Sequence, residues 1–92
     1  MGQKLSVELS HELEEAKKLV RIGGLYFHYK SPDKLYSIVA LGFFESTEEI
    51  CVVYKALYEN GFTWIRTLTN FFELVETPQG TVSRFSEINN SR

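Results

Sequence analysis

The chain has 92 residues, of which 43% are hydrophobic and 24% are charged, and its formal net charge is −2. This length fits one domain, and the composition argues against a disordered chain. The charge is low and no run of Lys or Arg exceeds two residues, which argues against a nucleic-acid partner.

The single cysteine, Cys51, lies in an apolar run and suits a reducing compartment. Neither a signal-peptide pattern nor an apolar run of membrane-spanning length is present. We therefore expect a cytoplasmic protein without a membrane partner. Gly2 and Ser6 formally match an acylation pattern. We interpret the match as chance, because the second signal that stable anchoring requires is missing.

Residues 6–22 are predicted to form an N-terminal helix, capped by Ser6 or Ser10 and stopped by Gly23 and Gly24. Its apolar stripe consists of Leu9, Leu13, Ala16 and Val20. We expect this stripe to pack on the rest of the domain. A helix that binds a partner is the alternative.

Strand patterns follow the helix at residues 25–30, 35–44, 50–57, 62–67 and 73–77, with a further edge strand at 81–85. Asn60 and Gly61 join the third and fourth strands in a hairpin, which we expect to be the central pair of the sheet. A turn is predicted at residues 31–34 and a helical corner at 68–72. On the first strand, we expect Leu25, Phe27 and Tyr29 to face inward.

These elements predict a mostly β (α+β) fold: a small five- to six-stranded antiparallel, SH3-like, partly open barrel with one N-terminal helix. Residues 1–92 are expected to form a single domain. Within it, residues 6–22 would be the helix, 24–85 the barrel-like part and 86–92 a frayed tail.

Five residues that carry flat or polar side-chain tips on strands form the candidate ligand-binding site. They are Tyr26, His28, Tyr54, Trp64 and Arg66. Tyr, Trp and Arg contribute most of the binding energy at many interfaces. We expect Tyr26, His28 and Arg66 to be exposed, and Trp64 to belong to the core. The alternative is that the whole set is structural, with Arg66 stacked on an aromatic ring or paired with a glutamate.

The sequence predicts no catalytic residues, metal site or cofactor. The thiol of Cys51 with the imidazole of His28 or His11 is the one thiol and imidazole combination available, and a thiol in an apolar strand is usually inert. Two histidines and one cysteine far apart match no metal-ligand spacing. We expect a protein that is not an enzyme, and a small enzyme using His28 is the least favoured alternative.

Five motifs occur in order: GLYFHYK at 24–30, VVYKALY at 52–58, WIR at 64–66, FFE at 71–73 and RF at 84–85. Together they resemble the small bacterial family catalogued as domain of unknown function 1653. The resemblance implies a compact, mostly β domain of bacterial origin, without an assigned function. The chain departs from the family pattern at Ser31-Pro32, where Gly is common, at Thr67, where Pro is common, and at Phe43-Phe44, where a polar segment with His is common.

Our leading hypothesis is a non-enzymatic binding or accessory module for an extended peptide or a small anionic ligand. The alternative is a self-associating structural domain, a homodimer in which Phe43 and Phe44 are buried.

Overall fold

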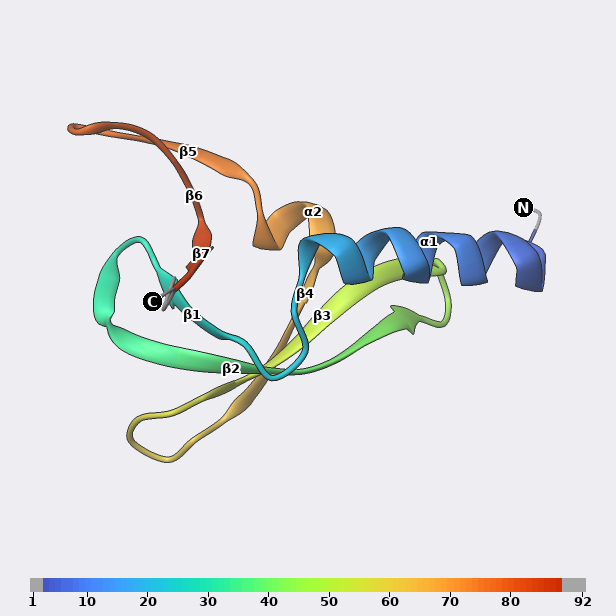
Figure 1. Ribbon diagram of the computed structural model, residues 1–92, viewed down its shortest axis with the longest axis horizontal. Helices are drawn as coiled ribbons and strands as arrows, with labels where there is room; N and C mark the ends of the chain where they lie inside the picture. The colour runs from blue at the N-terminus through green and yellow to red at the C-terminus, as the bar shows by residue number, and fades with distance from the viewer. Residues whose placement is uncertain (1–2, 89–92) are drawn as a thin grey trace.

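The computed structural model describes residues 3–88, which form two antiparallel sheets and an N-terminal helix (Figure 1). In chain order the elements are α1 (Ser6–Leu19), β1 (Leu25–His28), β2 (Ser31–Phe44), β3 (Glu49–Ala56), β4 (Thr63–Thr67), α2 (Leu68–Phe71), β5 (Leu74–Thr77), β6 (Gly80–Ser83) and β7 (Phe85–Glu87). The predicted mostly β fold with one N-terminal helix is confirmed, with seven strands in place of five or six.

The larger sheet has the strand order β4-β3-β2-β1-β7. Strands β1 to β4 form a meander, α2 follows β4, and β7 returns to pair with β1, which is the element order expected for a partly open SH3-like barrel. Within residues 3–88, β4 and β7 do not pair with each other, so the barrel is not closed. The hairpin of β3 and β4 is confirmed, but β2 is the middle strand and β4 is an edge strand.

Two turns differ from the predictions by a few residues. In the β3–β4 turn, the N–H of Gly61 donates to the carbonyl of Tyr58 at 3.0 Å, so Glu59 and Asn60 are its central residues. Both Glu59 and Gly61 have positive φ angles, 51° and 66°. The β1–β2 turn lies at residues 29–30, because His28 already pairs with Ser31. The predicted turn at residues 31–34 is instead an irregularity within β2 that includes Pro32, a residue that sheets tolerate at bulges.

The helix α1 ends at Leu19, three residues before the predicted end, because Val20 adopts an extended conformation. Its N-terminal cap is also not a serine, since Leu5 precedes the helix and donates its N–H to the carboxylate of Glu8 at 2.9 Å. None of the helices within residues 3–88 is long and apolar enough to cross a membrane.

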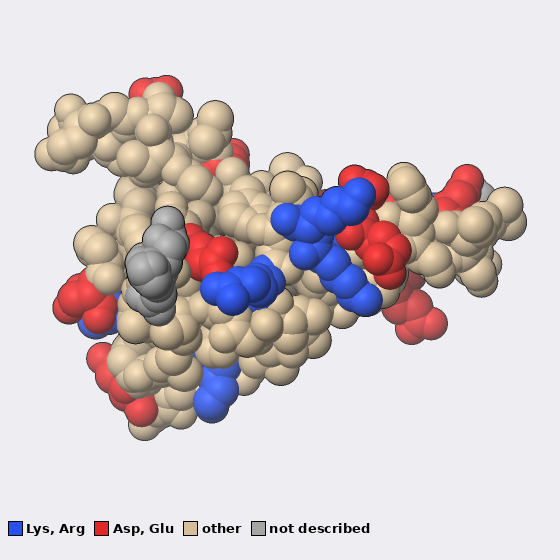
Figure 2. All heavy atoms as spheres, viewed as in Figure 1, with Lys and Arg blue, Asp and Glu red and all other residues tan. Residues whose placement is uncertain are grey.

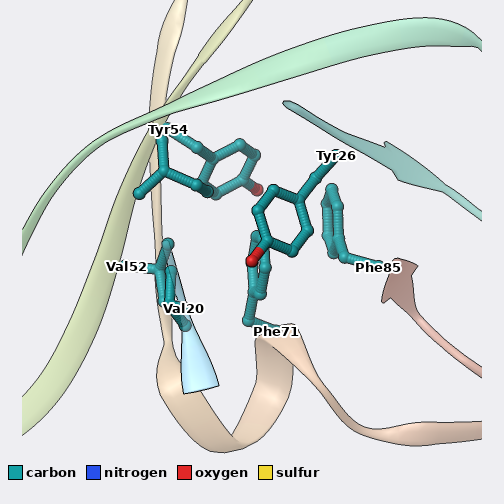
Figure 3. Close-up of a cluster of buried hydrophobic side chains, with 7 residues drawn as sticks. Val20, Tyr26, Val52, Tyr54, Phe71 and Phe85 are labelled. Carbon is teal, nitrogen blue, oxygen red and sulfur yellow. The ribbon is translucent and has the colours of Figure 1, made fainter. Parts of the chain in front are cut away.

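The core is one cluster of buried side chains between α1, α2 and the larger sheet (Figure 3). Its members are Val20, Tyr26, Ile38, Val52, Tyr54, Phe71 and Phe85. The rings of Phe71 and Phe85 stack at 4.3 Å between centroids. This aromatic contact holds α2 against β7.

The first strand faces the opposite way from the prediction. Tyr26 is buried and Phe27 is only partly buried on the other face. Alternation defines two faces of a strand but does not say which one is covered. Tyr26 can be buried because its hydroxyl accepts the N–H of Arg21 at 3.3 Å and its ring contacts Phe71 edge-on.

The segment after residue 85 is ordered further than we predicted. Ser86 and Glu87 belong to β7, and the N–H of Ile88 donates to the carbonyl of Leu25 at 2.8 Å. The prediction of fraying is therefore wrong for residues 86–88. The remainder of the predicted tail, residues 89–92, and the first two residues of the acylation pattern lie outside the described residues.

Candidate functional site

Trp64 and Arg66 lie on one face of β4, opposite Tyr54 and Val52 of β3. Trp64 is 50% exposed, so the prediction that it belongs to the core is wrong. The reason is its position, since β4 is an edge strand and no other strand of residues 3–88 lies beyond it. The ring of Trp64 contacts Phe62 edge-on at 6.1 Å, and Phe62 is itself exposed.

Arg66 is half-buried and held by uncharged groups on three sides. Its Nε donates to the hydroxyl of Tyr54 at 2.8 Å, and its Nη1 donates to Oδ1 of Asn70. The guanidinium carbon lies 5.4 Å from the centre of the Phe85 ring, within the range of a cation–π contact. Asn70 is fixed in turn by α2, whose cap residue Thr67 accepts the N–H of Asn70 at 3.1 Å. These contacts together fix the orientation of the guanidinium.

The charge of Arg66 is not neutralised by a neighbouring carboxylate. The other two arginines within residues 3–88 are paired, Arg21 with Glu87 and Arg84 with Glu73. In Figure 2, the Lys and Arg side chains at the middle and right of the face lie next to Asp or Glu, whereas the one at its lower edge does not. Arg66 makes no ion pair with any described residue, although it is less exposed than Arg21. The fixed cation thus retains N–H groups that can bind an anion.

His28 contacts the same Phe85 ring as Arg66 and is partly buried. Its imidazole is perpendicular to that ring at 5.0 Å and stacks on Tyr29 at 4.8 Å. Burial, followed by the positive charges of Arg66, Arg84 and Lys30, lowers the pKa of His28. Both causes disfavour the protonated form of the imidazole.

Arg66, Tyr54, Phe85 and His28 contact one another and form what we call the Arg66 cluster. Two tyrosines that we did not predict, Tyr36 and Tyr58, complete it. The hydroxyls of Tyr36 and Tyr58 lie 2.5 Å apart, and the ring of Tyr36 contacts both Tyr54 and Phe85 edge-on. Burial and the hydrogen bond to Tyr58 raise the pKa of Tyr36. Tyr36 and Tyr58 are 22 residues apart, and the sequence does not indicate that they meet. Their contact depends on the register between β2 and β3.

The five predicted site residues divide into two groups. His28, Trp64 and Arg66 reach the surface at least in part, whereas Tyr26 and Tyr54 are 1% and 4% exposed. The expectation that Tyr26 is exposed is therefore wrong, because its ring fills the core beside Phe71. Tyr54 contacts the more exposed group through its hydroxyl, which accepts from Nε of Arg66. Burial raises the pKa of Tyr54 although this bond acts in the opposite direction.

Cys51 and His28 lie far apart in the sheet. Cys51 pairs with Gly42 and His28 pairs with Ser31, so they adjoin opposite ends of β2. Burial raises the pKa of the Cys51 thiol, which disfavours the thiolate that a nucleophile requires. In the part of the chain that the structure describes, no three His, Cys, Asp or Glu side chains gather closely enough to hold a metal ion.

Apart from these side chains, the structure has a concave region between β1 and the hairpin of β5 and β6. It is a cavity of about 420 Å³ lined by Phe27, Tyr29, Lys30, Thr77, Pro78, Gln79, Val82, Ser83 and Ser86. His28, Trp64 and Arg66 do not border this cavity, although Phe27 and Tyr29, which flank His28 in the chain, do. The cavity is thus separate from the Arg66 cluster.

Comparison with known proteins agrees with the motifs and with the fold. A protein of the DUF1653 family from Bordetella bronchiseptica has a similar solved structure, with a TM-score of 0.64 and 30% sequence identity, over 76% of this chain and 90% of that one. No curated protein matched the sequence. The sequence model of the DUF1653 family, described as proteins of unknown function, matches residues 24–87. Because this match covers more than half of the chain, the protein belongs to the DUF1653 family.

Proposed function

We propose that this protein is a non-enzymatic binding module that holds an anionic group, on an extended peptide or a small molecule, against Arg66. The observation that carries the proposal is the oriented, half-buried guanidinium without a carboxylate partner among the described residues. A fixed arginine loses little conformational entropy when it binds a carboxylate or phosphate, and its planar N–H groups match both.

The surroundings of Arg66 support an anion over a neutral ligand. Burial is the first cause of the lowered pKa of His28, and the positive charges of Arg66, Arg84 and Lys30 add to it, so three cationic side chains act on this point of the surface. Trp64, two residues before Arg66 on the same strand face, offers an exposed aromatic surface to the rest of the ligand. Charge and aromatic area together are typical of sites that dominate binding energy.

A binding role is favoured over catalysis because the groups that chemistry requires do not converge. Nδ1 of His28 accepts the N–H of Lys30 at 3.1 Å, and this bond occupies one imidazole nitrogen in closing the β1–β2 turn. The Cys51 thiol is buried and donates to the carbonyl of Glu49 at 3.5 Å. Neither group has an activated partner near Arg66 in the described structure.

The test is an NMR titration with three probes: inorganic phosphate, and two N-acetylated peptides of one sequence, one with a free C-terminal carboxylate and one with an amide. We expect phosphate and the carboxylate peptide to shift the Arg66 Nε–H and Trp64 indole signals, and the amide peptide to leave them unchanged. The variant Arg66→Gln should weaken binding at least about tenfold.

The matched control is Arg21→Gln, which removes an arginine whose side chain is 72% exposed and already paired with Glu87. This variant should bind both anions as the parent protein does. If Arg66→Gln remains folded and binds equally well, or if both arginine variants lose binding alike, the proposal is wrong.

A further inference from the structure

The strand β4 is an open edge of the larger sheet. It pairs with β3 on one side, and within residues 3–88 no strand pairs with its other side. Proteins usually protect such edges with Lys, Pro, a bulge or a covering segment. The sequence Thr-Trp-Ile-Arg-Thr of Thr63–Thr67 has no Lys or Pro, and its pairing with β3 has no register shift. Ile65 at its centre is 65% exposed.

The backbone groups that face this open side can be assigned from the register. The N–H of Ala56 donates to the carbonyl of Phe62, so these two residues form a hydrogen-bonded pair. Hydrogen-bonded and non-hydrogen-bonded pairs alternate along an antiparallel ladder. Trp64 and Arg66 therefore direct their N–H and C=O groups toward β3, while Thr63, Ile65 and Thr67 direct theirs outward.

We infer that this edge pairs with β4 of a second copy of the chain, antiparallel and centred on Ile65. This register places Ile65 opposite Ile65, and Thr63 opposite Thr67 on both sides of it. All of these residues have outward backbone groups, so the ladder of each copy is satisfied by the other. Trp64 of each copy lies opposite Arg66 of the other, which brings an aromatic ring beside a cation that has no carboxylate partner among the described residues.

Moving the centre of the pairing from Ile65 to either neighbouring residue makes the pairing worse. Centring it on Arg66 would place two guanidinium groups opposite each other. Centring it on Trp64 would leave Thr67 without a partner in β4. The strand is therefore self-complementary about Ile65, which is the condition for an isologous two-fold interface. The two five-stranded sheets would join into one continuous sheet of ten strands.

The apolar face beside Ile65 adds area to this interface. Ile65 borders a shallow hollow of about 110 Å³ that is also lined by Gly42, Phe43, Phe44, Cys51 and Val53. Ile65 lies on the strand face opposite Trp64 and Arg66. The Ile65 side chain of the second copy would extend this hollow across the two-fold axis. This gives Phe44, which is exposed in the single chain, a place at the rim of the contact.

The inference does not depend on the anion proposed for Arg66. It predicts that sedimentation velocity detects a monomer–dimer equilibrium in the absence of any ligand. Ile65→Lys puts a charge at the centre of the interface and should weaken the dimer at least about tenfold. Leu74→Lys is the matched control, because Leu74 is 70% exposed on β5, outside the larger sheet, and it should leave the dimer unchanged.

Amide hydrogen exchange tests the register directly. The N–H groups of Thr63 and Ile65 should exchange slowly at high protein concentration and rapidly on dilution, while those of Trp64 and Arg66 stay protected at both. A protein that is monomeric at about 1 mM overturns the inference. So does a dimer that responds equally to the two lysine variants, or one whose Thr63 and Ile65 amides exchange rapidly at every concentration. The monomeric Ile65→Lys variant should still bind phosphate if the proposed function is correct, so the two proposals can fail separately.

Discussion

The hydroxyl of Tyr54 has one defined role in the structure, which is to hold Arg66, and Tyr54→Phe removes that role alone. The Tyr54 ring is 4% exposed and keeps its contacts with Phe71 and Phe85 in the variant. The bond it loses is a 2.8 Å contact with a charged donor. Such bonds contribute about 1.5–3 kcal/mol. Because Arg66 is only half-buried, water can replace part of the contact, and we expect the lower end, about 1.5–2 kcal/mol.

The assay is urea and thermal unfolding followed by far-UV circular dichroism. Trp64 fluorescence is a poor probe because the indole is already half-exposed in the folded state. For a domain of this size, 1 kcal/mol corresponds to a Tm change of about 4–8 °C, so Tyr54→Phe should lower Tm by roughly 6–16 °C. The urea m-value should not change, since the surface exposed on unfolding is the same.

Tyr26→Phe is the matched control, since it also deletes a buried hydroxyl. That hydroxyl accepts a neutral backbone N–H of Arg21 at 3.3 Å, so the expected cost is about 0.5–1 kcal/mol. A double-mutant cycle of Tyr54→Phe with Arg66→Met should give a coupling energy of about 1 kcal/mol or more. If Tyr54→Phe costs no more than Tyr26→Phe and the cycle shows no coupling, Arg66 is not held as the structure indicates and the anion proposal loses its basis.

Three further predictions concern pH and packing. Burial lowers the pKa of His28, so its protonation is harder in the folded state and stability should fall as pH drops below about 6.5; His28→Gln should remove this part of the pH dependence in urea unfolding. Burial is the first cause that raises the pKa values of Tyr26, Tyr36 and Tyr54 above 10. The free energy of unfolding should therefore fall as pH rises above about 10. Absorbance at alkaline pH should show these tyrosines ionising only as the protein unfolds. Phe85→Ala should cost about 3–5 kcal/mol, because the ring is buried and contacts both Phe71 and Arg66, whereas the exposed Phe44→Ala should stay within about 0.5 kcal/mol at low protein concentration.

The element order could be predicted from sequence because local signals were strong. The alternation at residues 50–57 and 62–67 and the turn residues between them predicted the β3–β4 hairpin, and the glycines after Ile22 predicted the end of α1 to within three residues. The position of that hairpin at the edge of the sheet could not be predicted this way. It depends on β7 pairing with β1 and not with β4, and β1 and β7 are about 60 residues apart in the sequence.

Burial was predicted less well, for a physical reason that Tyr26 and Trp64 illustrate. Both are amphipathic aromatics, and such residues serve equally well in a core or on a surface. Tyr26 is buried because a backbone N–H reaches its hydroxyl, and Trp64 is exposed because, among residues 3–88, no strand pairs with the outer side of β4. Neither condition is visible in the neighbouring residues. The pair of Tyr54 and Arg66 was predicted as part of one site, whereas Asn70, which completes the support of the guanidinium, gave no local signal.

Asn70 connects the guanidinium to a part of the fold that otherwise stands apart. Its side-chain oxygen accepts from Arg66, while its backbone carbonyl accepts Nε of Arg84 at 3.1 Å. Glu73 precedes β5 and Arg84 follows β6, and their ion pair lies at the base of the β5–β6 hairpin. Figure 1 shows this hairpin extending away from the larger sheet. One residue of α2 thus contacts both the guanidinium of Arg66 and the base of the hairpin, and Thr77, Pro78, Gln79, Val82 and Ser83 of that hairpin line the cavity beside β1.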